Sequence, residues 1–128
     1  KPQLEAIDKA SVNDQKIIQN AEPDLYYRDK DVAHKIKQLY SDSMEFDFSP
    51  YHGTIDVVFI DGAHHFEAVK SDTENALNLI KPDGIILWHD FAMYGDYNDV
   101  TRAILECIPK KEVVQIGSTS LAIYKNNN

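Results

Sequence analysis

The sequence contains few of the residues on which several common small folds depend. A single cysteine, Cys107, excludes an internal disulfide framework and a multi-cysteine zinc site, and it suits a reducing cytoplasm. The five glycines are scattered along the chain, so a phosphate-binding G-x-G-x-x-G loop or P-loop is absent from it. No apolar run is much longer than a strand, so we expect no secretory leader, no membrane partner and a cytoplasmic location.

Positive charge is also scarce. The chain has 21 acidic and 13 basic residues and a formal net charge of −8, which disfavours a nucleic-acid backbone as its partner. Its 128 residues are 43% hydrophobic and 27% charged, as in an ordinary globular domain and unlike a disordered chain. We therefore predict a single domain over residues 1–128 with a disordered tail at 126–128.

The middle of the chain carries the clearest structural pattern. Residues 55–60 (IDVVFI) and 85–88 (IILW) are apolar and rich in β-branched and aromatic side chains, which is typical of strands buried on both faces. Between them, apolar residues at helical spacing predict a helix over 66–80. The Lys-Pro-Asp-Gly sequence at 81–84 then predicts a turn. This order indicates a strand–helix–strand unit.

The end of the chain adds a second helix and a hairpin. Apolar residues on one face predict a helix over 100–108. Alternating segments at 112–116 and 120–124 flank Gly117-Ser118-Thr119 and predict an antiparallel hairpin. The sequence therefore predicts an α/β fold with a Rossmann-like, mainly parallel sheet and a C-terminal antiparallel hairpin.

The first part of the chain gives weaker signals. We predict a short strand over 4–7, a short helix over 13–20 and an exposed or edge strand over 34–40. Residues 44–48 alternate aromatic or sulfur-containing side chains with acidic ones, and this pattern is compatible with a strand or with a packed loop.

Polar side chains follow both central strands of the predicted sheet. The first strand ends in Asp61-Gly62-Ala63-His64-His65, and the second ends in His89-Asp90. Ligands of open α/β sheets bind beyond the carboxyl ends of the strands, which lie about 4.8 Å apart. The carboxylates and imidazoles could hold a divalent cation or act as a general base. Alternatively, an aspartate at a strand end caps a helix or closes a turn.

These residues resemble a known family. Residues 55–72 (IDVVFIDGAHHFEAVKSD) and 77–90 (LNLIKPDGIILWHD) are similar to class I S-adenosylmethionine-dependent methyltransferases. The similarity is to the branch with the patterns F-I-D-G-x-H-x-Y-E-x-V-x-x-D and L-x-P-G-G-x-I-x-x-H-D. It extends over about residues 36–125, including residues 37–43, which resemble the branch's third strand and its acidic turn. The resemblance implies a partial class I methyltransferase fold.

The resemblance also implies roles for individual residues. It places Asp42 and Ser43 beside the adenine of S-adenosylmethionine, and it suggests Asp8 as the residue that binds the ribose. The remaining implied positions cluster after the two central strands. The implied catalytic residues are Asp61, His64, His89 and Asp90, the implied metal ligands for Mg²⁺ are Asp61 and Asp90, and Asp61 and Gly62 also contact the cofactor.

The sequence departs from the family pattern in several places. Ser41 and Asp83 replace common glycines, His65 replaces a common serine, and Phe66 replaces a common tyrosine. The family's first strand and glycine-rich cofactor loop should precede Lys1. The resemblance therefore implies an N-terminally incomplete domain that has lost cofactor binding or forms a homo-oligomer through an exposed sheet edge.

Three functional hypotheses follow. The first is a methyltransferase domain that transfers a methyl group from S-adenosylmethionine to a small-molecule acceptor at an oxygen. The second is a non-catalytic remnant that serves as a binding or assembly module of a larger protein. The third is a metal-dependent hydrolase that uses Asp61, His64, His65, His89 and Asp90.

Overall fold

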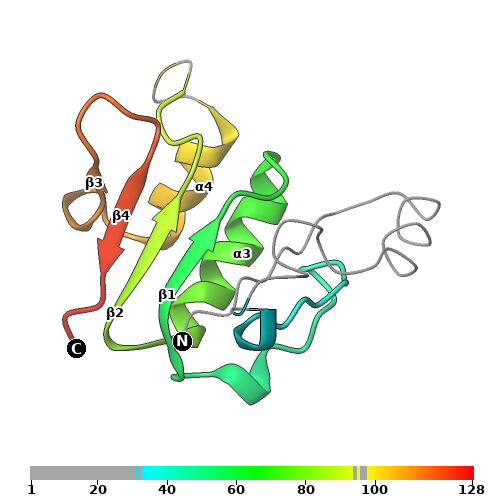
Figure 1. Cartoon of the computed structure of the whole chain (residues 1–128). Coiled ribbons are helices and arrows are strands. Elements are labelled where there is room, and N and C mark those ends of the chain that lie inside the picture. Colours follow the sequence, from blue (N-terminus) through cyan, green and yellow to red (C-terminus); the bar gives the residue numbers. More distant parts are fainter. Residues whose placement is uncertain (1–30, 32, 94, 96–97) are drawn as a thin grey trace.

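The computed structural model describes residues 31, 33–93, 95 and 98–128 of the chain (Figure 1). The strand expected over 4–7, the helix expected over 13–20 and Asp8 lie outside the described residues. The helices and strands of the described part follow in chain order. They are the 3₁₀ helices η1 (Ala33–Lys35) and η2 (Ser49–Tyr51), β1 (Ile55–Ile60), α3 (Phe66–Leu79), β2 (Ile80–Trp88), α4 (Asp99–Cys107), the 3₁₀ helix η3 (Lys110–Glu112), β3 (Val114–Gln115) and β4 (Ala122–Lys125).

The strands form one sheet in the order β1-β2-β4-β3. β1 and β2 are parallel and are joined by α3, whereas β4 is antiparallel to both β2 and β3. Figure 1 shows α3 and α4 side by side behind the strands, and both helices pack on that one face of the sheet. The structure confirms the expected α/β architecture, in which β1 and β2 are parallel and the C-terminal strands form an antiparallel hairpin.

Local sequence explains where the two long helices begin. His65 is the N-cap of α3, and its Nδ1 atom accepts a hydrogen bond from the backbone N–H of Ala68 at 3.4 Å. Asn98 is the N-cap of α4, and its Oδ1 atom accepts a hydrogen bond from the backbone N–H of Thr101 at 2.7 Å. Both helices then turn an apolar stripe toward the sheet.

The core lies between the two helices and the sheet. Trp88 and Ile86 of β2 and Ile104 of α4 are completely buried there. The Nε1 atom of Trp88 donates a hydrogen bond of 3.0 Å to the hydroxyl of Thr73, which is also completely buried. This bond satisfies both polar groups inside the core and joins β2 to α3.

The turn expected at residues 81–84 lies within the bounds of β2. The pairing with β1 shifts there, because Ile55 lies opposite Ile80 while Val57 lies opposite Ile85. Gly84 is needed at this point, since a Cβ atom on it would lie 2.8 Å from the Cβ atom of Ile80. β2 thus begins five residues earlier than the sequence predicts and contains an irregular segment.

Residues 34–40, predicted to be an edge strand, form no strand. Ala33–Lys35 is the 3₁₀ helix η1, and residues 36–40 have no regular secondary structure. Their alternating pattern has no partner strand in the described part of the sheet to pair with. Residues 44–48, for which the sequence left two options, contain a turn and no strand.

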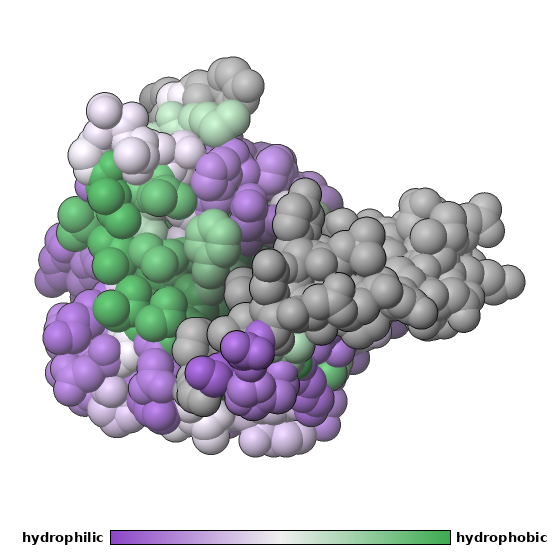
Figure 2. All heavy atoms as spheres, in the orientation of Figure 1, coloured by the Kyte–Doolittle hydropathy of each residue, from purple (hydrophilic) through white to green (hydrophobic). Residues whose placement is uncertain are grey.

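The prediction that β1 is buried on both faces is also wrong. Val57 and Phe59 are 40% and 49% exposed, whereas Val58 and Ile60 pack against the core. β1 is an edge strand among the described residues, and only one of its faces is covered by α3. Figure 2 shows the resulting apolar area in front of the strands, in the orientation of Figure 1.

The predicted tail begins at a residue that contacts the sheet. The backbone of Asn126 donates to the carbonyl of Gly84 at 2.8 Å and accepts from the N–H of Asp83 at 2.9 Å. Its side chain donates to the carbonyl of Lys81 at 3.2 Å. Among the described residues, no helix has the length and hydrophobicity needed to cross a membrane.

Candidate active site

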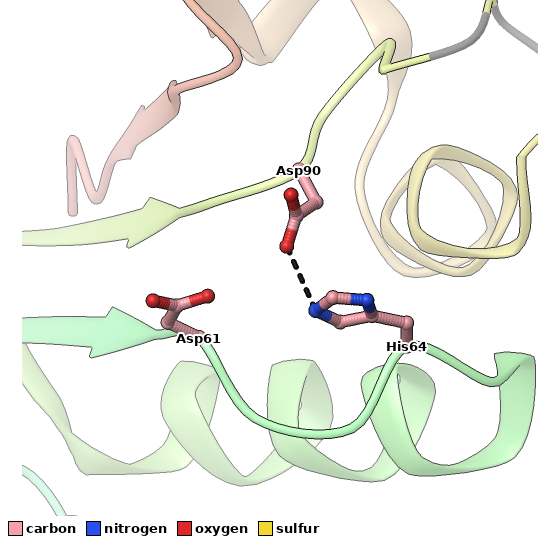
Figure 3. Close-up of side chains that lie close together, drawn as sticks. All are labelled: Asp61, His64 and Asp90. Carbon is pink, nitrogen blue, oxygen red and sulfur yellow. Dashed lines mark ion pairs between the residues drawn. The ribbon is translucent and has the colours of Figure 1, made fainter.

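Three side chains converge beyond the carboxyl ends of β1 and β2. Asp61 directly follows β1, His64 lies in the loop between β1 and α3, and Asp90 lies two residues beyond β2. Figure 3 shows the three side chains pointing toward one another. One ligand atom from each lies within 4.8 Å of the other two. The parallel pairing of β1 and β2 therefore produces the cluster that the sequence predicts.

Asp90 is the buried centre of this cluster. Its side chain is only 10% exposed, and its Oδ2 atom lies 2.8 Å from the Nε2 atom of His64. Its Oδ1 atom lies 3.0 Å from the Nδ1 atom of His89. One carboxylate thus contacts two imidazoles, which come from different loops.

His89 lies between the two aspartates. Its Nδ1 atom is shielded from water and lies 3.0 Å from Asp90 and 3.5 Å from Asp61, but neither carboxylate meets it at a hydrogen-bonding angle. Contact with the Asp90 carboxylate nonetheless raises the pKa of His89, and the negative charges of Asp90 and Asp61 act in the same direction. The protonated imidazole is therefore favoured at this position.

Asp61 is the more open of the two carboxylates, with a side chain that is 47% exposed. The side chain of His64 is 62% exposed. A small molecule approaching beyond the strands can therefore reach Asp61 and His64, while Asp90 remains behind them. Asp61 is therefore the carboxylate that a bound molecule can contact, and Asp90 is the one that the protein encloses.

Other predicted site residues lie apart from this cluster or have structural roles. Gly62 lies in the same loop as Asp61 and His64, whereas His65 caps α3. The Oδ1 atom of Asp42 accepts from the N–H of Met44 at 2.9 Å, so this aspartate closes a local turn. Within the described part of the chain, no hydrogen bond or ion pair links Asp42 or Ser43 to the cluster. Their contact with a cofactor stays a prediction.

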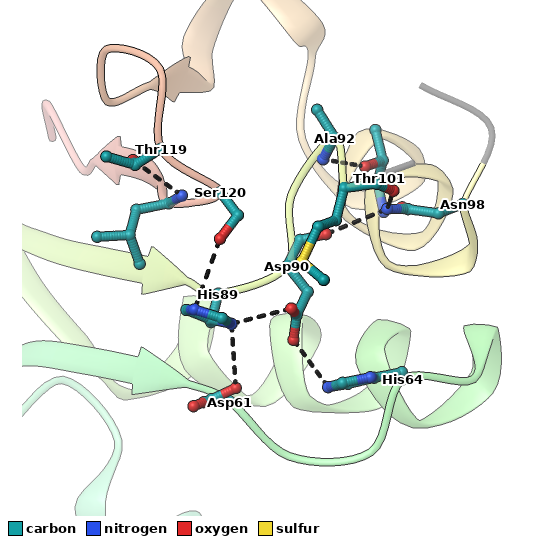
Figure 4. Close-up of polar contacts among 11 residues, drawn as sticks. Asp61, His64, His89, Asp90, Ala92, Asn98, Thr101, Thr119 and Ser120 are labelled. Carbon is teal, nitrogen blue, oxygen red and sulfur yellow. Dashed lines mark hydrogen bonds and ion pairs between the residues drawn. The ribbon is translucent and has the colours of Figure 1, made fainter. Parts of the chain in front are cut away.

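The structure also brings Ser120 and Asn98 to the site, which the sequence alone does not predict (Figure 4). The Ser120 hydroxyl lies 3.5 Å from the Nε2 atom of His89, and its carbonyl accepts from the N–H of Phe91 at 2.9 Å. Asn98 donates through its side chain to the carbonyl of Asp90 at 3.1 Å. Neither residue follows β1 or β2 directly, where the sequence points to a site. The one available signal is that Asn98 lies just before the helix α4.

Asp61, His64 and Asp90 together offer two carboxylates and one imidazole. This combination of oxygen and nitrogen ligands suits a divalent transition metal, and the two carboxylates with water suit Mg²⁺. The Nε2 atom of His64 also lies 2.8 Å from the Oδ2 atom of Asp90, so the same two side chains can form an ion pair or a hydrogen bond. The donor set fits a cation.

Comparison with known proteins identifies the family and a similar fold. A family model described as a methyltransferase domain matches residues 4–91, and the chain therefore belongs to the methyltransferase domain family. A crystal structure of a protein from Corynebacterium glutamicum has a similar fold, with a TM-score of 0.61 and 16% sequence identity. The match covers 98% of this chain and 61% of that one, so this chain spans less than two thirds of its neighbour's length. A search of curated proteins gives no significant match.

Proposed function

We propose that this domain transfers a methyl group from S-adenosylmethionine to a hydroxyl oxygen of a small-molecule acceptor. The observation that carries the proposal is the convergence of Asp61, His64 and Asp90 beyond two parallel strands in a methyltransferase domain. This is where open α/β sheets bind their ligands. Asp61 is exposed and Asp90 is buried. Asp61 can therefore exchange a proton with a small molecule, while Asp90 positions the neighbouring histidines.

In this proposal, Asp61 is the general base. Its exposed carboxylate accepts the proton of the acceptor hydroxyl as that oxygen forms a bond to the methyl carbon. The sulfonium of S-adenosylmethionine supplies the methyl group, and S-adenosylhomocysteine leaves as the carbon–sulfur bond breaks. Most of the rate comes from holding donor and acceptor in line.

Asp90 and His89 have supporting roles. The buried Asp90 carboxylate orients His64 and His89, and the raised pKa of His89 favours an imidazolium between the two aspartates. That positive charge lies between the two aspartates and offsets the repulsion between them. If a divalent cation such as Mg²⁺ binds, Asp61, His64 and Asp90 would hold it, and it would make the acceptor hydroxyl more acidic.

Two measurements test the proposal. Calorimetric titration of the chain with S-adenosylmethionine should show saturable binding. Transfer of a labelled methyl group to hydroxyl-bearing acceptors should fall about 10²–10⁴-fold in Asp61→Ala, the usual contribution of a general base. Asp56→Ala is the matched control, because Asp56 is an exposed carboxylate on β1, the strand that Asp61 follows, and pairs with Lys81 away from the cluster. A folded Asp61→Ala variant with full activity would refute the role of Asp61.

The second hypothesis, a binding or assembly module, also has an observation in its favour. Val57 and Phe59 of β1 lie opposite Ile85 and Leu87 of β2, so these residues share the face of the sheet that the helices leave open. A second copy of the chain would cover this face or extend the β1 edge. Absence of heat with S-adenosylmethionine, together with reversible dimerisation in sedimentation experiments, would favour this function over catalysis.

A further inference from the structure

The loop that carries Asp90 has an unusual backbone. Asp90 and Ala92 both have positive φ angles, of 63° and 55°, although neither is glycine. Residues with a Cβ atom adopt this left-handed conformation at a cost, so it persists only where surrounding contacts hold it. Asp90 is also the buried centre of the candidate site, so whatever holds this loop also sets the position of the carboxylate.

Contacts from two other elements hold the loop (Figure 4). At the start of α4, the Nδ2 atom of Asn98 donates to the carbonyls of Asp90, at 3.1 Å, and of Met93. The hydroxyl of the fully buried Thr101 accepts from the N–H of Ala92 at 2.7 Å. Before β4, the carbonyl of Ser120 accepts from the N–H that follows Asp90.

The Asn98 side chain does more than cap α4. Capping uses only its Oδ1 atom, which accepts from Thr101. The two carbonyl contacts use Nδ2, and all three contacts require the same orientation of the amide. Aspartate and serine cap helices as well as asparagine does, but neither carries an amide that can donate to two carbonyls at once. An asparagine at position 98 therefore serves the loop, through its contacts with the two carbonyls, as well as the helix, through its cap.

We propose that Asn98 is a positioning residue for the active site. Through the carbonyls of Asp90 and Met93, it ties the start of α4 to the loop after β2. It thereby fixes the carboxylate that contacts His64 and His89. This inference rests on the proposed function in one respect: Asp90 belongs to a methyl-transfer site only if the domain is a methyltransferase of the proposed kind.

Asn98→Asp separates the two roles of this side chain. The variant keeps the oxygen that caps α4 but places its other carboxylate oxygen against two carbonyl oxygens. Asn98→Asp/Asp99→Asn restores the net charge at the start of the helix. Asp99→Asn alone is the matched control, because exposed Asp99 pairs with Arg102 of the same helix. Asn98→Ser keeps a helix cap and does not place a charged oxygen against the two carbonyls. If Asn98→Asp does not fold, Asn98→Ser tests the proposal in its place.

The readout is the side-chain nitrogen spectrum of protein labelled with ¹⁵N-histidine, recorded at one pH with a chelator present. We expect the signals of His64 and His89 to shift in Asn98→Asp and in the double variant, and to shift less in Asn98→Ser. Exposed His34 and His52 serve as internal references and should keep their signals. The urea midpoints of Asn98→Ser and Asp99→Asn should stay close to that of the unchanged chain.

Two results would overturn the proposal. One is a folded Asn98→Asp variant in which His64 and His89 keep their signals. The other is a shift of every histidine together with a lower urea midpoint in Asn98→Ser, which would make Asn98 a helix cap alone. A chain that does not bind S-adenosylmethionine would refute the proposed reaction, whereas the histidine spectra would still decide whether Asn98 positions Asp90.

Discussion

Asp83 occupies a backbone position that favours glycine. It occupies a position where the resembled methyltransferase motif has glycine, and its φ angle in the structure is 63°. Glycine adopts this left-handed conformation freely, whereas a side chain with a Cβ atom does so at a cost. The departure from the motif is therefore a small, local loss of stability in the irregular segment of β2.

We predict that Asp83→Gly stabilises the protein by up to about 1 kcal/mol, because glycine relieves the unfavourable backbone conformation. The substitution also removes an exposed ion pair with Lys125, at 3.4 Å, which contributes little. Urea unfolding measures the change. Asp83→Ala is the control and should destabilise the protein, since it loses the ion pair and keeps the Cβ atom. Equal stability of the two variants would contradict this account.

At the residue scale, the sequence predicts the central part of the candidate site but not its surroundings. Asp61, His64, His89 and Asp90 follow two recognisable strands, so their convergence depends only on parallel pairing. Ser120 comes from the distant hairpin, and its approach to His89 depends on how β4 aligns with β2. Nothing near Ser120 in the sequence signals that alignment.

At the scale of elements, α3 and β2 are joined by one polar contact inside the core. Thr73 lies on the apolar stripe that predicts the helix, and its hydroxyl accepts the indole N–H of Trp88 at 3.0 Å. Both side chains are completely buried, so neither group can turn to water instead. The contact therefore joins the helix to the strand within the apolar core.

We predict that Thr73→Val lowers the free energy of unfolding by about 1–3 kcal/mol, because the nearly isosteric valine leaves the indole N–H unsatisfied. Urea unfolding gives the energy, and the single indole N–H resonance of Trp88 reports the bond directly. Thr73→Ser keeps the hydroxyl and should retain a resonance close to that of the unchanged protein. An indole signal that is unaffected in Thr73→Val would show that the bond does not form.

The sequence predicts α3, α4 and the hairpin well because their signals are local. Apolar spacing and a Gly-Ser-Thr turn act within a few residues of one another. The prediction failed for residues 34–40, because alternation alone cannot show whether a partner strand is present. It also failed for the outer face of β1, because burial there depends on what packs against the sheet.

On the scale of the whole molecule, the sheet has one face covered by helices and one face that is apolar and open among the described residues. Phe59, Leu87, Ile123 and Val114 form a row across all four strands, as the register of the pairs shows. Val114 and Phe59 are 58% and 49% exposed. We propose that a second copy of the chain covers this surface.

We predict that Phe59→Lys weakens self-association of the chain while changing the free energy of unfolding by less than about 0.5 kcal/mol, since the side chain is half exposed. Sedimentation velocity over a range of concentrations measures the first effect and urea unfolding the second. Val58→Lys is the matched control on the same strand. Val58 points toward the core, so this variant should be strongly destabilised. Unchanged association in Phe59→Lys would exclude the open face as the interface.

The sequence by itself determined the strand–helix–strand unit, the C-terminal hairpin and the identity of the residues that follow the two central strands. These features arise from short-range periodicity and from the fact that parallel strands end at one edge of a sheet. Only the tertiary structure decided which groups surround them: the burial of Asp90, the approach of Ser120, and the hold of Asn98 on a left-handed loop. Such contacts join residues from separate elements, and the distance between elements is set by packing, which no local pattern encodes.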